Sequence, residues 1–378
     1  MNITIVCDVL GEVNNGTILA TTNLINYLRA HGHKVTVVSP DKSTEGKEDY
    51  LVVPTLNLGK ALNKVVSRNG VTLAKTDKDL LLKSMENADV VHIQMPLILG
   101  SVAAKLANEQ GKLLTASFHC QAENVTAHFG LMNSEHANKL VYKKFYENVY
   151  QYADRVHYPT KFIKDLFEST VGKKTNGLVI SNGVNEMFFN RCEDIKPNSK
   201  FTIVCSGRYS KEKAQWQLID AIAQSKHKDE IKLILAGSGP NKKQLLKRAA
   251  KAGIDMDLTF FKREDMIRML QSADLYVHSA LIEIEAIACM EAIVCGLVPI
   301  ICNSKRSATT AFALDERNLF EPKNTLELAN KIDYFIDNKD ALREYKERYR
   351  DVSKNFALEH CMQQMEKMFI DLVEEYKR

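Results

Sequence analysis

Short apolar runs rich in valine and isoleucine alternate with longer helical patterns from one end of this chain to the other. In the first half of the chain, these runs lie at residues 3–7, 34–39, 89–94, 113–118, 155–158 and 178–181. Continuous apolar runs are typical of strands that are buried on both faces of a parallel sheet. The sequence therefore predicts an α/β protein with doubly wound parallel sheets covered by helices.

The alternation pauses once, in a polar segment at 191–200, and then restarts. The later apolar runs lie at 201–205, 232–236, 258–261, 275–278 and 298–301. A length of 378 residues suits two domains. We expect an N-terminal Rossmann-like domain at 1–193, a linker at 194–200, a second Rossmann-like domain at 201–352, and a C-terminal helix at 353–378 that packs back toward the first domain.

Composition excludes several classes of protein. The chain has 51 Lys and Arg against 47 Asp and Glu, a net charge of +4, which is too small for a dedicated nucleic-acid binder. The longest nearly apolar stretch, 281–302, carries three glutamates and is not expected to span a membrane. Eight cysteines without a CxxC pair, and an N-terminus without a basic leader, predict a cytoplasmic protein with reduced thiols.

Two glutamates give the strongest chemical pattern. Glu283 is expected in the loop after strand 275–278, and Glu291 about one turn inside the helix that follows. A helix N-terminus attracts a diphosphate, and carboxylates beside it accept hydrogen bonds from sugar hydroxyls. The alternative is a helix whose glutamates face solvent.

A second pattern follows strand 201–205. Gly207 lets the backbone turn, and Arg208 and Lys213 flank the expected start of a helix, where two cations would neutralise a departing diphosphate. The alternative is a solvated helix start. Two weaker glycine loops follow strands 3–7 and 232–236, where Gly16 and Gly239 permit close approach of the backbone to a phosphate or sugar.

Taken together, these motifs resemble the retaining glycosyltransferases of family 4 type, and the resemblance spans nearly the whole chain. It also includes Gly-His-Lys-Val at 32–35 and the segment 179–184. It implies the GT-B fold, in which two Rossmann-like domains face each other and the active site lies in the cleft between them.

The resemblance also implies roles for matched positions. Arg208 and Lys213 would hold the donor diphosphate, Glu283 would bind hydroxyls of the donor sugar, and Glu291 would bind the nucleotide ribose. His119 matches the histidine that faces the donor sugar near its anomeric centre; the alternative is a packed histidine at a strand end. The expected catalytic residues are His119, Arg208, Lys213 and Glu283, and the expected substrate-binding residues are Gly16, Gly207, Gly239, Ile284, Glu285, Ala286, Ile287 and Glu291.

The chain departs from the family pattern at two places. The family has Pro, an aromatic residue and Gly after the first glutamate, where this chain has Ile284, Glu285 and Ala286. The usual Lys-Gly is Lys213-Ala214. We expect alanine to be tolerated at the helix start, with shifted backbone contacts to the sugar that leave the donor sugar open.

The motif Asp-Met-Asp at 255–257 has the form of a metal motif from another glycosyltransferase fold. It is expected in a turn between a helix and a strand, without a metal role. No metal site and no cofactor are expected, and the UDP-sugar donor is a substrate.

The segment 121–152 is the expected acceptor region. It contains Phe129 and Leu131, followed by a helix with Lys139, Lys143 and Lys144 among aromatic residues. This pattern suits an anionic membrane surface and resembles the bacterial diacylglycerol glucosyltransferases of the same family. The alternative is an ordinary amphipathic helix on the sheet, and the segment 58–68 is a second weakly basic candidate.

The expected function is transfer of a hexose, glucose first, from a UDP-sugar to a lipid or glycan acceptor of the cell envelope, with retention and without metal. The expected location is the cytoplasm, including peripheral contact with the inner face of the plasma membrane. A sugar-nucleotide 2-epimerase and a non-catalytic GT-B partner subunit are the alternatives.

Overall fold

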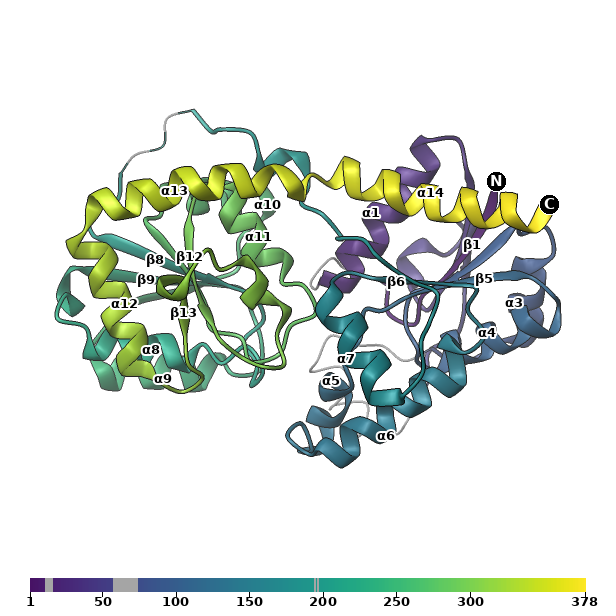
Figure 1. The fold of residues 1–378 in the computed structure, drawn as a ribbon, viewed down its shortest axis with the longest axis horizontal. Helices are drawn as coiled ribbons and strands as arrows, with labels where there is room; N and C mark the ends of the chain where they lie inside the picture. The colour runs from purple at the N-terminus through teal and green to yellow at the C-terminus, as the bar shows by residue number, and fades with distance from the viewer. Residues whose placement is uncertain (11–15, 57–73, 194, 196) are drawn as a thin grey trace. The chain divides into compact units, whose positions relative to one another are not determined.

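The computed structural model describes residues 1–10, 16–56, 74–193, 195 and 197–378. The chain forms two compact units (Figure 1). The first contains Met1–Asn182 and Cys361–Arg378, and the second contains Gly183–His360. The candidate helix at 58–68 lies outside the described residues.

The first unit is built on a seven-stranded sheet in the order β3-β2-β1-β4-β5-β6-β7, and all its strand pairs are parallel. The strands are β1 (Asn2–Val6), β2 (Lys34–Ser39), β3 (Tyr50–Val52), β4 (Val90–Ile93), β5 (Leu113–Ser117), β6 (Arg155–Tyr158) and β7 (Gly177–Val179). The predicted doubly wound parallel sheet is confirmed. The order reverses between β1 and β4, and such a switch point opens a crevice beyond the carboxyl ends of the strands.

Helices pack along this sheet (Figure 1). They are α1 (Gly16–Ala30), α3 (Lys78–Met85), α4 (Ile98–Glu109), α5 (Ala122–Thr126), α6 (Glu135–Phe145), α7 (Lys161–Val171) and α14 (Leu358–Lys377). The buried carboxylate of Asp8, just after β1, accepts hydrogen bonds from the backbone N–H groups of Leu99 (2.7 Å) and Gly100 (2.9 Å) in the first turn of α4. A Cβ at Gly100 would lie 2.1 Å from the carbonyl oxygen of Met95, so only glycine fits this junction.

The C-terminal helix α14 buries a stripe of methionines against the first unit. Met362, Met365 and Met368 are each at most 3% exposed. On the same helix, Glu366 accepts a hydrogen bond from the Tyr27 hydroxyl (3.2 Å) and lies 2.7 Å from His33 Nε2. These contacts hold residues 361–378 in the first unit.

The second unit contains a six-stranded sheet in the order β10-β9-β8-β11-β12-β13, again with parallel pairs. Its strands are β8 (Phe201–Ser206), β9 (Ile231–Ala236), β10 (Asp255–Thr259), β11 (Leu275–His278), β12 (Val298–Cys302) and β13 (Leu319–Phe320). Its helices are α8 (Trp216–Gln224), α9 (Lys242–Ala252), α10 (Arg263–Ser272), α11 (Ile287–Val294), α12 (Thr325–Asp337) and α13 (Lys339–Ser353). The switch point lies between β8 and β11.

One strand differs from its predicted position. The sequence places strand 258–261 after a turn that contains Asp255 and Asp257, whereas β10 begins at Asp255. Because β10 is an edge strand, its side chains alternate in exposure, and both carboxylates pair with Lys232 on β9 (3.3 and 2.8 Å). A half-exposed edge strand does not show the continuous apolar run on which the prediction depends.

The boundary between the units also differs from the predicted end of the first domain at 193. The first unit ends at Asn182 because the residues that follow pack in the second. Val184 donates a backbone hydrogen bond to the Phe356 carbonyl (2.7 Å), and Phe188 is 1% exposed in the core of that unit. The predicted linker therefore begins after the chain has already entered the second unit.

Candidate functional site

In the second unit, the candidate residues come from two loops beside the switch point. The loop 207–213 follows β8 and the loop 279–286 follows β11, and these two strands are neighbours in the sheet. The carboxyl ends of such strands are where doubly wound sheets bind ligands. The fold thus brings together the two motifs that the sequence singles out.

An ion pair joins these loops. Lys213 Nζ contacts Glu283 Oε1, and His278 Nε2 lies 3.2 Å from the same oxygen. Burial raises the pKa of Glu283, but the charge of Lys213 and the contact with His278 outweigh it and bring the pKa to about 2. Glu283 is therefore an anion at any physiological pH.

His278 is a site residue that sequence reasoning missed. It is the last residue of β11 and is 3% exposed. The available indication was a histidine at the carboxyl end of an otherwise apolar strand, next to the loop that carries Glu283. The structure makes it the second partner of that carboxylate.

Backbone contacts fix the two loops to each other. The Ser279 hydroxyl donates to the Lys213 carbonyl (2.8 Å), and Gln217 Nε2 donates to the Ser279 carbonyl (2.9 Å). The Leu281 N–H donates to the Glu212 carbonyl (2.7 Å). Lys213 and Glu283 are therefore held in place before any substrate arrives, which is the condition for electrostatic catalysis.

Arg208 lies on the same loop as Lys213, and one glycine of this loop and one of a neighbouring loop shape the backbone around it. Burial lowers the pKa of its guanidinium from the usual value. The Tyr209 N–H donates to the Ser238 carbonyl (2.8 Å), and a Cβ at Gly239 would lie 2.5 Å from the Tyr209 carbonyl oxygen. Gly239 thus serves close packing of its loop on the Arg208 loop, and Gly207 directly precedes Arg208.

The two alanines that replace glycines of the family pattern, Ala214 and Ala286, have the left-handed backbone conformation that favours glycine. Ala286 caps the N-terminus of α11 with φ 67°, and Ala214 has φ 47°. A left-handed conformation costs a residue with a Cβ roughly 1–2 kcal/mol. Both alanines adopt this conformation, and Ala286 does so at the start of α11, where the sequence predicts that alanine is tolerated.

The remaining residues of this motif surround the first turn of α11. Ile284 and Ile287 are half-buried, and Glu285 is buried. Glu291 lies one turn inside the helix, where burial raises its pKa to about 7 against the opposing charge of Arg263. Glu291 is therefore not the freely solvated helix glutamate of the alternative interpretation.

In the first unit, the structure brings Gly16 and His119 to neighbouring positions. Gly16 begins α1, and the Thr17 hydroxyl lies 3.5 Å from the His119 carbonyl oxygen. His119 follows the end of β5, and burial, with His157 and His92 nearby, holds its pKa well below the usual value. Its ring is therefore neutral at pH 7.

A buried chain of hydrogen bonds lies at the ends of the central strands of this unit. His157 Nε2 is 2.7 Å from the Ile180 carbonyl, which only accepts, so this nitrogen carries the proton. Burial lowers the pKa of His157 to about 4 and of His92 to about 3, so both rings are neutral. The Ser117 hydroxyl therefore donates to His157 Nδ1 (2.9 Å). The same hydroxyl accepts a hydrogen bond from His92 Nε2 (2.9 Å). At the other end of the chain, the Thr115 hydroxyl donates to His92 Nδ1 (2.8 Å).

The Asp-Met-Asp motif pairs with lysines. Asp255 lies 3.1 Å from Lys200 and 3.3 Å from Lys232, and Asp257 lies 2.8 Å from Lys232. Across the described ranges, no group of three or more His, Cys, Asp or Glu side chains is arranged to hold a metal ion.

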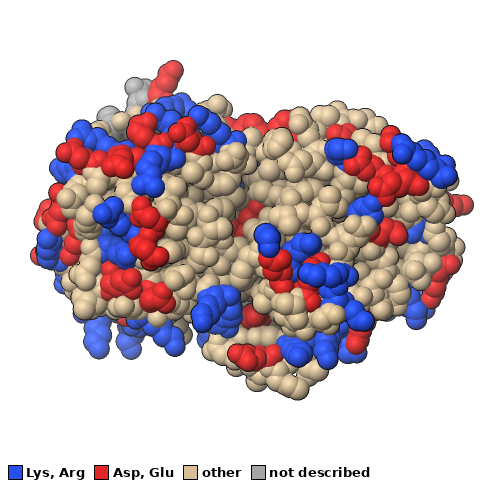
Figure 2. All heavy atoms as spheres, viewed as in Figure 1, with Lys and Arg blue, Asp and Glu red and all other residues tan. Residues whose placement is uncertain are grey.

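A basic and apolar surface lies on α6 and the turn before it. Lys139, Lys143 and Lys144 are exposed, and Lys and Arg side chains gather in Figure 2 over the place where Figure 1 shows α6. Leu140 is 51% exposed on the same helix, and Phe129 is 70% exposed before it. Among the described helices, none has the length and apolar character needed to cross a bilayer.

Two Rossmann-like units, each built on a parallel sheet with loops at its switch point, are the architecture of the GT-B fold. The sequence matches the family "Glycosyltransferase Family 4" over residues 15–187 and "Glycosyl transferases group 1" over residues 188–353. The chain therefore belongs to the glycosyltransferases of this group, as the motifs indicated, and it is a transferase.

Several known proteins are similar to this chain in sequence or in fold. An α-monoglucosyldiacylglycerol synthase from Acholeplasma laidlawii is 23% identical over 95% of this chain and 94% of its own length. The structure of Anabaena Alr3699/HepE with UDP and glucose is 18% identical, covers 98% of this chain and 99% of its own, and superposes with a TM-score of 0.76. The catalytic domain of cholesterol-α-glucosyltransferase from Helicobacter pylori is 44% identical over 42% of this chain and 99% of its own, with a TM-score of 0.41.

Proposed function

We propose that this protein is a retaining glycosyltransferase that moves glucose from UDP-glucose to a lipid alcohol of the cell envelope. The observation that carries the proposal is the preorganised Lys213–Glu283 pair beside the N-terminus of α11. The name of the Acholeplasma laidlawii relative supports glucose and a lipid acceptor.

The proposed chemistry uses the charges of these residues. Arg208 and Lys213 hold the donor diphosphate and stabilise the negative charge that grows on the departing phosphate oxygen. Glu283 remains an anion and accepts hydrogen bonds from hydroxyls of the donor sugar. His119, neutral at pH 7, faces the anomeric centre without placing a second cation beside the oxocarbenium-like sugar.

The acceptor is proposed to reach the enzyme at a membrane surface. The exposed lysines of α6 complement anionic headgroups, and Phe129 and Leu140 supply the apolar contact that an interfacial helix needs. The protein is thus proposed to be cytoplasmic and peripheral on the inner face of the plasma membrane.

A panel assay tests the function. The purified protein is incubated with UDP-glucose, UDP-galactose and UDP-N-acetylglucosamine, and with diacylglycerol, cholesterol, glycolipids and simple glycans as acceptors. The expected product is an α-glucoside of a lipid alcohol, identified by NMR of its anomeric proton. A β-glucoside would overturn retention, epimerised UDP-sugar formed without any acceptor would favour the 2-epimerase, and no turnover with any pair would favour a non-catalytic subunit.

Chelation tests the proposed independence from metal. With saturating substrates, activity in excess EDTA is expected to stay within about twofold of the untreated enzyme, because Arg208, Lys213 and the α11 N-terminus supply the positive charge that a divalent ion supplies in other enzymes. EDTA already saturated with Mg²⁺ is the control. Complete loss that Mn²⁺ restores would contradict the metal-free proposal.

Replacing Glu291 by alanine tests the proposed ribose contact. The carboxylate would accept hydrogen bonds from the ribose hydroxyls, so we expect UDP affinity to fall about tenfold or more. Isothermal titration with UDP measures this change. Glu264→Ala on the exposed first turn of α10 is the matched control and should keep the wild-type affinity.

The pKa of Glu291 gives this test a second, pH-dependent readout. Because the pKa is raised to about 7, the folded protein binds this proton more tightly than the unfolded chain. The protonated group therefore favours folding in acid, and this contribution is lost as pH rises from the ordinary value of 4.5 to about 7. As pH rises toward 7, the Glu291 carboxylate ionises, and the UDP affinity of the wild type should increase relative to that of Glu291→Ala. Equal UDP affinity of the two proteins at every pH would make Glu291 a structural residue.

A further inference from the structure

Gln94 is a buried polar residue that the proposed mechanism does not use. It directly follows β4, at the switch point of the first sheet, and is 0% exposed. In the part of the chain that the structure describes, neither the oxygen nor the nitrogen of its side-chain amide has a hydrogen-bond partner. A buried polar group without a hydrogen bond destabilises the folded state, so such groups in native proteins usually have a partner.

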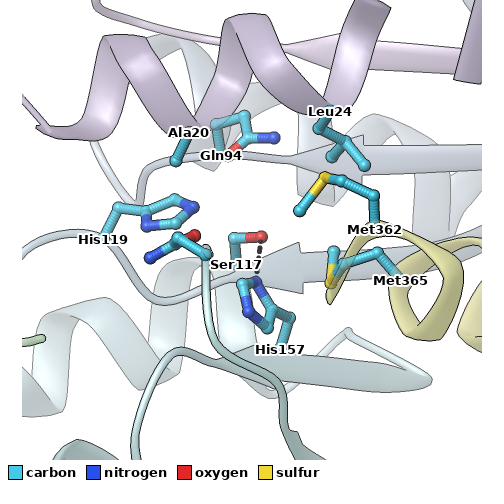
Figure 3. A pocket seen from close by; sticks show the side chains of 9 residues that line it. Ala20, Leu24, Gln94, Ser117, His119, His157, Met362 and Met365 are labelled. Atoms are coloured by element: carbon cyan, nitrogen blue, oxygen red, sulfur yellow. Dashed lines mark hydrogen bonds between the residues drawn. The ribbon is translucent and has the colours of Figure 1, made fainter. Parts of the chain in front are cut away.

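The Gln94 amide lines a small pocket inside the first unit (Figure 3). Besides Gln94, the polar part of its wall is formed by Ser117, His119, His157 and Asn182, and the apolar part by Ala20, Leu24, Met362 and Met365. Figure 3 shows the ring of His119 with a nitrogen turned toward the centre of the pocket. The space that the centre of a water molecule can reach is about 10 Å³, and one water needs roughly 10–15 Å³ by this measure.

The buried histidine chain limits what Ser117 and His157 can offer Gln94. His157 uses Nε2 to donate to Ile180 and Nδ1 to accept from Ser117. The Ser117 hydroxyl thus donates its proton to His157 and accepts a hydrogen bond from His92, so it has no proton to donate to Gln94. An occupant that satisfies Gln94 must donate to the amide oxygen and accept from the amide nitrogen, which a water molecule does and a simple ion does not.

We infer that one water molecule binds in this pocket between the Gln94 amide and the His119 ring, and that Gln94 is a positioning residue for His119. The water would hydrogen-bond to the ring nitrogen that faces the pocket, and so would fix the ring orientation and its tautomer. The other nitrogen is then left in a defined state for the substrate. The catalytic part of this inference depends on the proposed transferase role of His119.

A high-resolution crystal structure of the wild-type protein without substrate tests the water directly. We expect an ordered water within hydrogen-bonding distance of the Gln94 amide and of one ring nitrogen of His119. A pocket without such a water, or a water that contacts only Gln94, would overturn the inference. This measurement needs no variant and no activity.

A variant tests the positioning role in solution. Gln94→Met keeps the side-chain length and removes both polar atoms, so we expect the ring nitrogen signals of His119 to shift in ¹⁵N NMR of histidine-labelled protein. A His119→Gln variant assigns these signals among the ten histidines. Thr4→Val is the matched control, because it removes another buried hydrogen bond of the same unit (Thr4 Oγ1 to the Ser84 carbonyl, 2.5 Å) away from the pocket. Unchanged His119 signals in a folded Gln94→Met variant would overturn the inference.

The kinetic readout separates positioning from binding. We expect kcat of Gln94→Met to fall at least about tenfold, because small misplacements of reacting groups are costly, while KM for the donor stays within about twofold. Gln94→Ala enlarges the pocket and admits more water, and it should lose less kcat than Gln94→Met. If the wild type transfers no sugar but His119 still shifts in the spectra, the proposed function fails and the water-mediated contact stands.

Discussion

Replacing Lys213 by alanine is expected to lower kcat by about 10²–10³-fold, the usual cost of losing one preorganised charge at a developing anion. Lys213 is the cation that the structure holds against Glu283 at the switch point of the second sheet. When a diphosphate enters, this ammonium group would lie between the carboxylate and the phosphates. Its removal leaves Arg208 and the α11 N-terminus as the remaining positive groups.

The same variant should still fold. Lys213 is 25% exposed, and His278 remains 3.2 Å from the orphaned oxygen of Glu283. We expect less loss than the roughly 3–5 kcal/mol that follows when a fully buried ion pair is broken. Lys211→Ala, an exposed lysine two residues away, is the matched control and should keep wild-type kcat.

The pH dependence identifies the source of any stability loss. The pKa of Glu283 in the folded wild type is about 2, below its ordinary 4.5, so the pair contributes stability above pH 4.5 and loses it as pH falls toward 2. The difference in free energy of unfolding between wild type and Lys213→Ala should shrink over that range in urea titrations. A folded variant with kcat within threefold of wild type would remove Lys213 from the diphosphate site.

The sequence was sufficient to predict several interior strands of the two sheets, including β8 and β11, which precede the two site loops. Strands β6 and β11 have the bounds that their apolar runs predicted, and β8 and β12 extend one residue further. Each of these strands has a neighbouring strand on both sides in its parallel sheet, and its faces are covered by helices, so the run of apolar residues is continuous. Because ligands gather where such strands end, the positions of Arg208, Lys213 and Glu283 followed from the same pattern.

Edge elements and contacts between loops could not be obtained in this way. β3 and β13 have three and two residues, too short for a recognisable pattern, and β10 alternates acids with apolar residues. The contact of His278 with Glu283 and the unpartnered amide of Gln94 depend on which strands are neighbours, which no local pattern contains. His278 is the last residue of β11, and Gln94 directly follows β4; both strands lie beside a switch point. Knowledge of the strand order would therefore have identified both as candidate site residues.

The positive φ angles of Ala214 and Ala286 could not be predicted from the residue types alone. The sequence showed alanine where the family has glycine and suggested a local change of backbone. The structure shows positive φ at both residues, at the start of the two loops' helices. Tertiary contacts between the loops, such as that of Ser279 with Lys213, outweigh the preference of alanine for negative φ.

Reversing the three exposed lysines of α6 to glutamate is expected to weaken binding to anionic vesicles by about 10²-fold or more. Each lysine near an anionic surface contributes roughly 1 kcal/mol, and three together give about 3 kcal/mol before the added repulsion of the glutamates. Transfer to a lipid acceptor in vesicles should slow in parallel. Transfer to a soluble short-chain acceptor should survive, because Arg208, Lys213 and Glu283 belong to the second unit.

A matched variant separates the position of the lysines from net charge. Lys242, Lys243 and Lys247 are also exposed on one helix, α9, and their reversal to glutamate changes the net charge by the same amount in the second unit. Co-sedimentation with phosphatidylglycerol vesicles at low salt should release the α6 variant and retain the α9 variant. The difference should fade as salt rises, since the Debye length falls to about 3 Å at 1 M, while the contact of Phe129 and Leu140 persists. Equal release of both variants would show that vesicle binding depends on net charge and not on the position of the lysines. If the wild type binds no vesicles, a soluble glycan becomes the proposed acceptor. The helix α6 would then be an ordinary amphipathic helix with lysines on its exposed side.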